Sequence, residues 1–586
     1  MKKKTFGPFA LLGPYLWPYR WHYGAGLVCL ILVDGMQILI PQVSRSIIDA
    51  VVKGNLPLRQ LLLYLGALLL IAAIMSGGRF LWRYFISGSA RKIEAQLRQD
   101  LYEHLLKLSY DFYQQHKIGD LMARATNDLQ AVRQSISMGV VTFIDGTVMA
   151  LAILTILFIQ EPRTSVVAVL PLPLITILII AFGKLVGQRF KKVQELYSRL
   201  SEVVQESFAG SRVVKSFVKE GWFLRKFKDV NEEYIQANMG VTTMFGLFFP
   251  LVGFLSGITS LIVVLVGGRR VIMGELSVGT LVAVFSYVQM LIWPMLGAGF
   301  TINLIQRGAA SLERIGEIFH TPPTIVSPSQ PGRPLVGKSP VVIRIKNLHF
   351  AYPHGEAVLK GIDLDIPRGS LVGILGKTGS GKTTLLKTLC RLVDPPEGTV
   401  FLEDLDVRQW DLAQLRSCFG MTPQDAFLFS DSVKNNALYG LESPSREELL
   451  PALAIHAGLV RNLEEFTQGW DTVIGERGVS LSGGQKQRVS YARAIVRDPD
   501  ILLLDDAFSA VDAETEKHIL THLLKTRKGK GKTTIIVSHR ISTLQQADLV
   551  VVLDKGRIQE LGSPRDLARQ KGYYATIAQL QRISHG

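Results

Sequence analysis

Six long apolar segments in the first half of the chain constrain its fold more than any other feature. They occupy residues 24–43, 61–82, 140–160, 165–186, 241–267 and 279–304. About 20 apolar residues in a helix cross the hydrocarbon core of a bilayer, and a backbone surrounded by lipid must satisfy its hydrogen bonds internally. The sequence therefore predicts six transmembrane helices. Pro171 and Pro173 predict a kink in the fourth, because membrane helices tolerate proline.

The composition agrees with a membrane protein. Of the 586 residues 48% are hydrophobic, and the formal net charge is +16 at pH 7. A basic chain can bind nucleic acid or anionic phospholipid, and the apolar segments favour the membrane. Cys29, Cys390 and Cys418 show neither metal-ligand spacing nor a disulfide framework, which suits a reducing cytosol.

The links between the apolar segments differ in length and charge. Those after the first, third and fifth segments are short, whereas 86–139 and 187–240 are long, polar and periodic as helices are. Basic residues concentrate in the long links and at the N-terminus, which places both long links and both termini in the cytoplasm. The first apolar segment starts roughly twenty residues into the chain and has no small-residue cleavage site, so we expect a retained helix rather than a signal peptide.

Two features of this half leave alternatives open. The stretches 111–120 and 210–217, where the long links turn, mix aromatic residues, a glycine and charges. Each is either a docking surface or a solvated turn. Asp34 stands near the middle of the first apolar segment. A charge inside the membrane is costly and faces a cavity or a partner, so Asp34 is either half of a structural ion pair or a contact for substrate or a proton.

A phosphate-binding loop is the central motif of the second half. A Pro- and Gly-rich stretch at 321–340 marks a domain boundary, and a soluble α/β domain follows. The motif G-x-x-x-x-G-K-[ST] lies between a strand-like run at 371–375 and a helix-like run at 384–389, the context in which backbone N–H groups surround a polyphosphate. Lys382 is expected to reach the β- and γ-phosphates and the Thr383 hydroxyl to ligate Mg²⁺. The loop comprises Gly376, Lys377, Thr378, Gly379, Ser380, Gly381, Lys382, Thr383 and Thr384.

Further polar residues follow apolar strands. Asp505 ends an apolar run at 501–504, the Walker B arrangement in which a carboxylate holds Mg²⁺ through water. Gln424 and His539 each stand just past the end of a strand-like segment, where parallel α/β sheets bind ligands. A further glycine-containing motif precedes a helix; it consists of Leu481, Ser482, Gly483, Gly484 and Gln485.

Taken in order, these motifs resemble the ATPase domain of ABC transporters. The order is phosphate-binding loop, Gln424, the Leu-Ser-Gly-Gly-Gln signature, Asp505, the stretch from Ser509 to Asp512, and His539. Six spanning segments before that domain resemble an ABC exporter half-transporter, and 111–124 and 210–217 look like the family's two coupling helices. The resemblance covers nearly the whole chain. It implies an all-α membrane domain of six transmembrane helices with two long cytoplasmic hairpins at 1–320, a linker at 321–340 and an α/β P-loop ABC ATPase domain at 341–586.

The resemblance also implies roles for individual residues. Tyr352 matches the aromatic residue that stacks on adenine, and Gln424 matches the glutamine that contacts Mg²⁺ and the membrane domain. Ser482 and Gly484 match signature positions that cap the γ-phosphate bound by the opposite subunit. Asp512 matches the D-loop aspartate, and His539 the switch histidine near the γ-phosphate. The stretch 472–478 resembles the exporter loop that meets the coupling helices.

One position departs from the family pattern. The family usually carries, after the Walker B aspartate, the glutamate that polarises the attacking water, and this chain has Asp506 there. A carboxylate one methylene shorter is misplaced by an amount that can lower the rate about 10²-fold. A complete signature beside a shortened base resembles the heterodimeric multidrug exporters of the MdlA-like kind, in which one of two ATP sites hydrolyses poorly. The implied partner is a different half-transporter that supplies the missing glutamate.

These features together predict an ATPase that uses ATP and Mg²⁺ to export hydrophobic or amphipathic compounds, of the multidrug or lipid type, across the bacterial inner membrane. The expected partners are the second half-transporter, membrane lipid and a small amphipathic substrate, and no nucleic acid. One alternative is a homodimer that exports lipid or peptide and hydrolyses slowly at two equal sites. Another is a membrane-anchored ATPase that transports nothing. Fold-level analogy does not choose among drugs, lipids and peptides as substrate.

Overall fold

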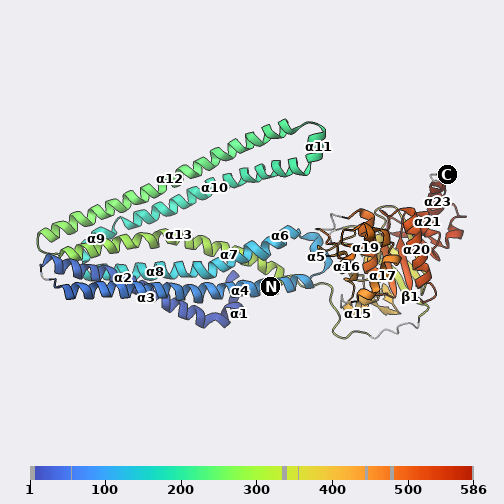
Figure 1. The fold of residues 1–586 in the computed structure, drawn as a ribbon, viewed down its shortest axis with the longest axis horizontal. Coiled ribbons are helices and arrows are strands. Elements are labelled where there is room, and N and C mark those ends of the chain that lie inside the picture. The colour runs from blue at the N-terminus through green and yellow to red at the C-terminus, as the bar shows by residue number, and fades with distance from the viewer. Residues whose placement is uncertain are drawn as a thin grey trace. The chain divides into compact units, whose positions relative to one another are not determined.

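The computed structural model describes residues 7–54, 56–332, 339–353, 355–441, 446–475 and 481–583. It divides into two compact units (Figure 1). The first comprises Met1–Leu106 and Lys117–Thr321, and the second comprises Lys107–His116 and Pro322–Gly586. The short segment Lys107–His116 therefore belongs with the C-terminal unit, although it lies in the first half of the sequence.

The described part of the first unit is all-helical. Single helical turns at Pro8–Leu12 and Trp17–Tyr19 flank α1 (Gly13–Leu16) near its start. π-helical turns at Arg83–Ser87, Arg124–Asp128 and Ser135–Gly139 join consecutive helices into longer ones. The helices are α2 (Arg20–Val52), α3 (Leu58–Trp82), α4 (Gly88–Lys107), α6 (Ile118–Ala123), α7 (Leu129–Gln134), α8 (Val140–Gln160), α9 (Pro162–Val169), α10 (Leu172–Ala209), α11 (Ser211–Ser216), α12 (Glu220–Ile272) and α13 (Val278–His320).

Five of the predicted spans lie within long apolar helices. Counted over the described residues, the helical stretches able to cross a membrane are Pro8–Val52, Leu58–Lys107, Ile118–Gln160, Glu220–Ile272 and Val278–His320. The predicted fourth segment, 165–186, is not one helix. It is divided between α9 and α10 because Pro171 and Pro173 lack the N–H groups that a continuous helix needs. The sixth span therefore stays a prediction.

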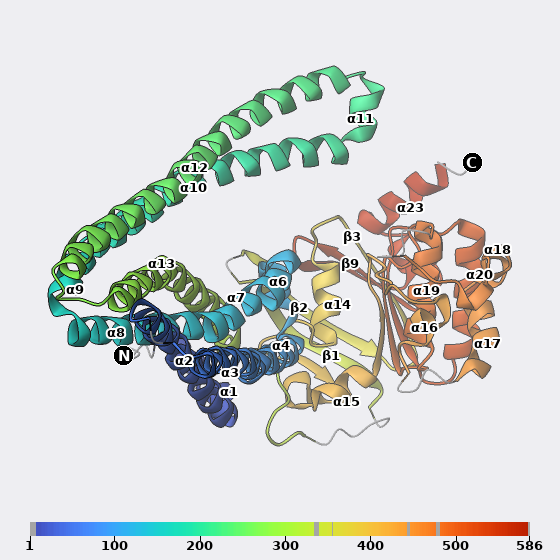
Figure 2. The same cartoon turned by 60° about the vertical axis from the view of Figure 1, so that its left-hand side comes forward.

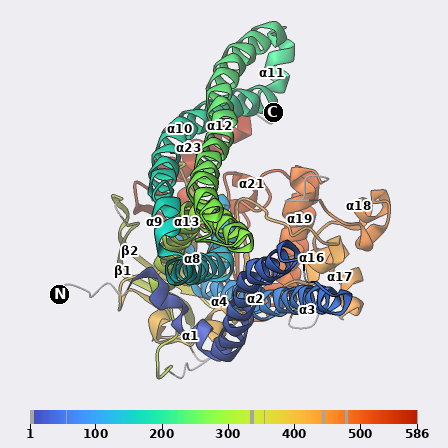
Figure 3. The same ribbon diagram turned by 90° about the vertical axis from the view of Figure 1, so that its left-hand side faces the viewer.

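Close packing and one buried hydrogen-bond chain hold the membrane helices together. Helices α2, α8 and α13 lie against one another, as the end view shows (Figure 3). Tyr287 on α13 is buried, donates to the Ile38 carbonyl at 2.8 Å and accepts from Gln42 Nε2 at 2.9 Å. Between α2 and α3, a Cβ atom on Gly78 would lie 2.6 Å from Val33 Cγ2. A small residue at this position lets the two helix backbones approach.

The second long link forms a helical hairpin. Helices α10 and α12 run side by side and α11 joins their far ends (Figures 1 and 2). The predicted helical hairpin is present, since α10 reaches Ala209 and α12 begins at Glu220 and continues through the predicted fifth span. Apolar side chains at the tip face solvent, with Val213, Phe217 and Val218 61%, 70% and 81% exposed. The turn thus presents an apolar surface.

The second unit contains two β-sheets. The smaller one is antiparallel, with strand order β2-β1-β4-β5. The larger one has the order β10-β9-β3-β8-β7-β6, in which β10 is an antiparallel edge strand and the other five strands are parallel. The strands are β1 (Val341–Ala351), β2 (Ala357–Pro367), β3 (Leu371–Gly376), β4 (Val400–Leu402), β5 (Leu405–Asp406), β6 (Phe419–Thr422), β7 (Ile501–Asp505), β8 (Thr533–Val537), β9 (Leu549–Asp554) and β10 (Arg557–Gly562).

Helices surround these sheets. They are α5 (Tyr110–Gln115), α14 (Lys382–Leu389), α15 (Leu412–Ser417), α16 (Val433–Leu438), α17 (Leu450–His456), α18 (Val460–Glu465), α19 (Gly483–Ile495), α20 (Ala513–Arg527), α21 (Ile541–Leu544), α22 (Pro564–Leu567) and α23 (Tyr573–Ile583).

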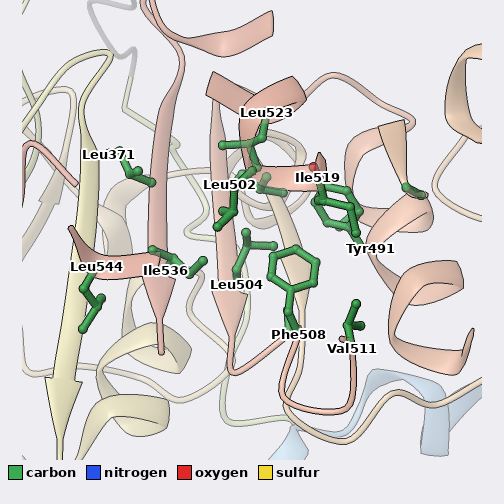
Figure 4. Close-up of a cluster of buried hydrophobic side chains, with 14 of the residues drawn as sticks. Leu371, Tyr491, Leu502, Leu504, Phe508, Val511, Ile519, Leu523, Ile536 and Leu544 are labelled. Carbon is green, nitrogen blue, oxygen red and sulfur yellow. The ribbon is translucent and has the colours of Figure 1, made fainter. Parts of the chain in front are cut away.

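The parallel sheet is buried on both faces, which is why its strands are continuous apolar runs. Successive side chains alternate between the faces, so Leu502 and Leu504 enter one core and Leu503 the other. Figure 4 shows the first core, where Tyr491 and Phe508 lie beside the strand side chains. Because parallel strands end at one edge of the sheet, the carboxyl ends of β3, β6, β7 and β8 lie together there.

Candidate nucleotide-binding site

A cavity of about 350 Å³ lies at this edge of the parallel sheet. Gly376 and Asp505 end strands β3 and β7, and Gln424 and His539 follow β6 and β8. The cavity brings together most of the predicted site residues. Its lining includes Tyr352, Thr378, Gly379, Ser380, Gly381, Lys382, Thr383, Thr384, Gln424, Asp505, Asp506 and His539.

The phosphate-binding loop holds its lysine from within. Lys382 is buried, and its Nζ atom donates to the carbonyls of Gly376 at 2.8 Å and Lys377 at 2.9 Å. Burial lowers the pKa of this ammonium group, while nearby Asp505 and Asp506 oppose that shift. Gly381 has φ +101°, a left-handed conformation that favours glycine. The loop thus keeps a buried cation at the cavity, as a polyphosphate site requires.

Asp505 and Thr383 offer oxygen ligands beside that cation. Asp505 is 2% exposed, and burial raises the pKa of its carboxyl group although the Thr383 hydroxyl hydrogen-bonds to it. Its Oδ2 atom is buried without a hydrogen-bond partner in the described structure. Mg²⁺ prefers such hard oxygens, and usually takes only one or two from the protein. The donors therefore fit Mg²⁺, and the described residues contain no larger group of metal-binding side chains.

Asp506 has a constrained backbone. Its φ is +47°, its N–H donates to the Val537 carbonyl at 3.1 Å, and its own carbonyl accepts from the Ser509 N–H at 3.3 Å. Asp tolerates the left-handed region better than most residues. With the backbone held from both sides, the reach of the carboxylate depends on the length of this side chain.

Tyr352 completes the cavity on the side of the smaller sheet. It follows β1, and its hydroxyl lies 3.3 Å from Thr384 Oγ1 of the phosphate-binding loop. Its ring meets Phe350 edge to face at 5.1 Å. An aromatic ring so placed is suited to stacking on a base.

The signature residues form a separate face. Ser482 caps α19: its hydroxyl accepts from the Gln485 N–H at 3.3 Å, and Gln485 Oε1 accepts from the Ser482 N–H at 2.9 Å. A Cβ atom on Gly484 would lie 2.6 Å from the Ala510 carbonyl oxygen. Ser482 and Gly483 are exposed. Leu481, Ser482, Gly483, Gly484, Gln485 and Asp512 are not among the described residues that line the cavity.

The D-loop is tied to this signature face. Gln487 on α19 donates to Ser509 Oγ at 2.8 Å and accepts from the Ala510 N–H at 2.9 Å. Asp512 caps α20 by accepting from the Thr515 N–H at 2.9 Å, a bond that lowers the pKa of its carboxyl group. The structure thus brings the predicted residues together in two groups rather than one.

Comparison with known proteins identifies the family in which these two groups of residues occur. Residues 23–295 match the model of the ABC transporter transmembrane region, and residues 359–509 match that of the ABC transporter family. The probable multidrug resistance ABC transporter YheI of Bacillus subtilis is 37% identical over 99% of this chain and 98% of its own length. The chain belongs to the ABC transporter family.

Two further relatives support this assignment. The multidrug resistance-like ATP-binding protein MdlA of Escherichia coli is 34% identical over 97% of this chain and 96% of its own length. The solved structure of a bacterial Atm1-family ABC exporter with ATP bound matches with a TM-score of 0.75 and 26% identity, covering 96% of this chain and 98% of that one. The predicted ABC exporter, with a helical membrane domain and an ATPase domain coupled to transport, is confirmed.

The first predicted coupling helix of this ABC transporter docks within the ATPase unit. Helix α5 begins at Tyr110, whose ring lies 4.8 Å from Lys387 Nζ on α14, the helix that starts at Lys382. Ser109 Oγ accepts from the backbone N–H groups of Thr324 and Ile325, both at 3.1 Å. For the first part of 111–120, docking within this unit is favoured over a solvated turn, whereas residues 117–120 are exposed.

Burial accompanies this docking. Phe112 is buried, and burial raises the pKa of Asp111, with Lys387 opposing the shift. In the predicted loop at 472–478, Val473 pairs with Ser432 as an isolated bridge. The remaining positions of that loop, 476–478, lie outside the described residues.

Two residues near the site had no signal in the sequence. Glu516 on α20 is buried and pairs with Arg540 and Thr543, which follow His539. Gln581 on α23 contacts the backbone of His539. Both contacts join segments separated by more than 20 residues and match no motif.

Proposed function

We propose that this ABC transporter is one half of a heterodimeric exporter, and that the ATP site on its own phosphate-binding loop turns over slowly. Asp506 carries the proposal. It lies in the nucleotide cavity where the family usually has a glutamate, and its backbone is bonded to Val537 and Ser509. A shorter carboxylate on a constrained backbone cannot move forward to the water that a glutamate would polarise, a difference that can lower the rate about 10²-fold.

The need for a second chain rests on the separate signature face. The cavity holds groups for a base, phosphates and Mg²⁺, but in the described structure none of the signature residues lines it. Ser482 and Gly483 are exposed instead. The apolar tip formed by Val213, Phe217 and Val218 is a second surface suited to a partner, since large exposed apolar patches mark interaction sites.

The signature itself is intact, which favours two unequal sites rather than two weak ones. Ser482 and Gln485 form a complete capping box, and Gly484 packs against Ala510. This lid is suited to close the partner's site, where the partner would supply the glutamate. The similarity to MdlA, named as a multidrug resistance-like ATP-binding protein, supports a cargo of the multidrug type.

ATP and Mg²⁺ are the cofactors of the proposed reaction. Tyr352 would stack on adenine, Lys382 and the loop N–H groups would bind the phosphates, and Thr383, Gln424 and Asp505 would hold Mg²⁺ directly or through water. When bound, Mg²⁺ neutralises charge on the phosphates. His539 would contact the γ-phosphate and Asp512 the opposite subunit.

The proposed cargo is a hydrophobic or amphipathic compound, moved across a bacterial inner membrane. Support comes from the relative named as a probable multidrug resistance transporter. We further propose that α9 and α10 provide the sixth span, which places both termini in the cytoplasm.

Asp34 is the proposed contact for cargo or a proton within the membrane. It is 1% exposed on α2, and its carboxyl group interacts with Asp145 on α8 and with Arg79 on α3. Its Oδ2 atom has no hydrogen-bond partner in the described structure, which favours a functional contact over a structural ion pair. Asp34→Asn is expected to change transport several-fold with ATP binding within about twofold. Asp34→Glu, which keeps the charge, is the control, and equal flux of every tested compound in all three proteins would make Asp34 structural.

Affinity purification of a tagged chain from native membranes tests the heterodimer. A different half-transporter with a glutamate after its Walker B aspartate is the expected companion, and the purified pair is expected to drive ATP-dependent flux in proteoliposomes. A homodimer that pumps at full rate would refute the unequal sites. ATP hydrolysis without flux of any tested drug, lipid or peptide would favour the non-transporting ATPase.

A further inference from the structure

The C-terminal helix α23 reaches the nucleotide site at both of its ends. Its first turn is held by Glu560 on β10, which accepts from the backbone N–H groups of Tyr573 and Tyr574. Next to them, a Cβ atom on Gly572 would lie 2.4 Å from Glu560 Oε1. The buried side chains of Tyr574 and Ala578 join the core of the ATPase unit. The helix is thus anchored to the sheet independently of any nucleotide.

The far end of α23 holds the backbone that carries His539. Gln581 Nε2 donates to the His539 carbonyl at 2.7 Å, and Gln581 Oε1 accepts from the Ile541 N–H at 2.8 Å. One amide side chain therefore grips the chain on both sides of Arg540. Two bonds from a single planar group fix the orientation of a segment as well as its position.

The opposite side of the same segment is also held. Arg540 pairs with Glu516, and Glu516 accepts from the Thr543 hydroxyl as well. Arg540 N–H donates to Ser538 Oγ at 3.0 Å. The His539 side chain is exposed and lines the cavity. Its position therefore depends on a backbone bracketed by α20 and α23.

The near end of α23 faces the phosphate-binding loop. Lys377 Nζ lies 5.7 Å from the centroid of the Tyr573 ring, within range of a cation–π contact. From Tyr573 to Gln581 the helix rises about 12 Å. One short rigid element thus connects the loop that would bind the phosphates with the segment that would contact the γ-phosphate.

We propose that Gln581 is a positioning residue for His539 and that α23 is a strap that sets the distance between this histidine and the phosphate-binding loop. The proposal rests on the proposed function only in assigning His539 to the γ-phosphate. Gln581 itself touches no reacting atom. Gln581 restricts the range of positions that His539 can take. Removing the Gln581 side chain is therefore expected to lower the rate of ATP turnover more than it weakens ATP binding.

Hydrogen exchange in the full-length transporter, purified with its partner, tests the grip directly. In Gln581→Ala the Ile541 amide is expected to exchange about 2–10-fold faster, since it loses one hydrogen bond. Gln581→Glu keeps the acceptor for Ile541 and loses the donor to His539, so its exchange is expected to stay near that of the natural chain. Gln579→Ala is the matched control, because Gln579 is an exposed glutamine on the same helix. Unchanged exchange at Ile541 in Gln581→Ala overturns the proposal.

Turnover at this chain's own site supplies the second measurement. In an Asp506→Glu background, which restores the longer base, and with the partner's glutamate changed to glutamine so that only this chain's site turns over, Gln581→Ala is expected to lower kcat about fivefold. KM for ATP should stay within about twofold, the pattern of an interaction needed only in the transition state. Gln581→Glu should fall between Gln581→Ala and the natural residue, and Gln579→Ala should change neither constant. Faster exchange with unchanged kcat makes α23 merely structural and overturns the positioning role. If Asp506→Glu does not raise turnover, the proposal of unequal sites fails, while the exchange result still decides whether Gln581 holds the backbone next to His539.

Discussion

Two surfaces of this ATPase domain differ in how complete they are within one chain. They are the phosphate-binding face, around Lys382 and Asp505, and the signature face, around Ser482 and Gly483. On the first face Lys382 and Asp505 are 9% and 2% exposed, and the lysine is bonded to carbonyls of its own loop. On the second face Ser482 and Gly483 are exposed. The first face is a cavity whose polar groups are already held in place, whereas the second is an exposed surface outside that cavity in the described structure.

The signature face is nevertheless not loosely built. The polar atoms of Ser482 and Gln485 satisfy the first turn of α19, and Gln487 ties that helix to Ser509 and Ala510. The hydroxyl that caps the helix is the one that would meet a phosphate. Helix N-termini favour anions, so the same local geometry serves both stability and recognition. Because each face is held by its own contacts, we expect a substitution to impair one face and leave the other intact.

Lys382→Ala should damage the phosphate-binding face most. The charge-assisted contact to the phosphates is lost, and ATP binding at this chain's site is expected to weaken about 10–100-fold. Photoaffinity labelling of this chain with an ATP analogue measures the effect, and labelling of the partner chain in the same complex is the internal control. Undiminished labelling of the Lys382→Ala chain would show that the loop does not bind the nucleotide.

Ser482→Ala should damage only the signature face. The variant loses the cap of α19, worth about 1 kcal/mol, and the hydroxyl that would meet the partner's nucleotide. We expect ATP turnover of the complex to fall about tenfold, while labelling of this chain stays within about twofold. Ser482→Asn restores a helix cap without the short hydroxyl and separates the two effects. If Ser482→Ala weakens labelling of its own chain instead, the two faces act on one site and the comparison fails.

The parts of the site that follow strands were predictable because each is local. The sequence pattern of a strand, a glycine-containing turn and a helix predicts the positions of Gly376 and Lys382. Apolar runs predict strands, and Asp505, Gln424 and His539 stand at or just past the ends of these strands. The fold class followed from the same patterns and from the apolar segments. The fourth segment was the exception, because Pro171 and Pro173 divide it into α9 and α10.

Contacts between distant segments were not predictable. Glu516 pairs with Arg540 across 24 residues, and Gln581 reaches His539 across 42. Nothing in the neighbouring sequence marks either residue, since their roles depend on how α20 and α23 pack on the sheet. The positive φ of Asp506 likewise has no signal in the sequence.

Asp506→Asn tests whether the ATP site on the phosphate-binding face contributes little to hydrolysis, although its binding groups are all in place. Asn keeps the size of the side chain and tolerates the left-handed backbone, so only the charge changes. We expect the ATPase rate of the complex to fall less than about twofold, because the partner's glutamate would drive most hydrolysis. Changing that glutamate to glutamine in the partner should nearly abolish activity. Loss of most activity in Asp506→Asn would make Asp506 a working base and the two sites equivalent.

The smallest effect expected is on stability, and its sign should be opposite on the two faces. Burial raises the pKa of Asp505 in the folded chain. The folded chain is therefore more stable with the Asp505 carboxyl group protonated. This stability is fully present below the unfolded pKa, near 3.9, and is lost as pH rises through the folded pKa. At pH 7.5, without nucleotide or Mg²⁺, Asp505→Asn should raise Tm by a few degrees, and the gain should vanish as pH falls toward 4.

Asp512 on the signature face provides the matched comparison. The Thr515 N–H lowers its pKa in the folded chain, so its ionised form stabilises above the unfolded pKa, and this contribution is lost as pH falls through the folded pKa. Asp512→Asn keeps a helix cap and should lower Tm slightly at pH 7.5, with the difference again vanishing in acid. Thermal unfolding from pH 4 to 8 measures both variants. A lower Tm for Asp505→Asn at pH 7.5 would show that Lys382 and Thr383 stabilise the Asp505 carboxylate more than burial destabilises it. The carboxylate would then already be satisfied without a metal ion.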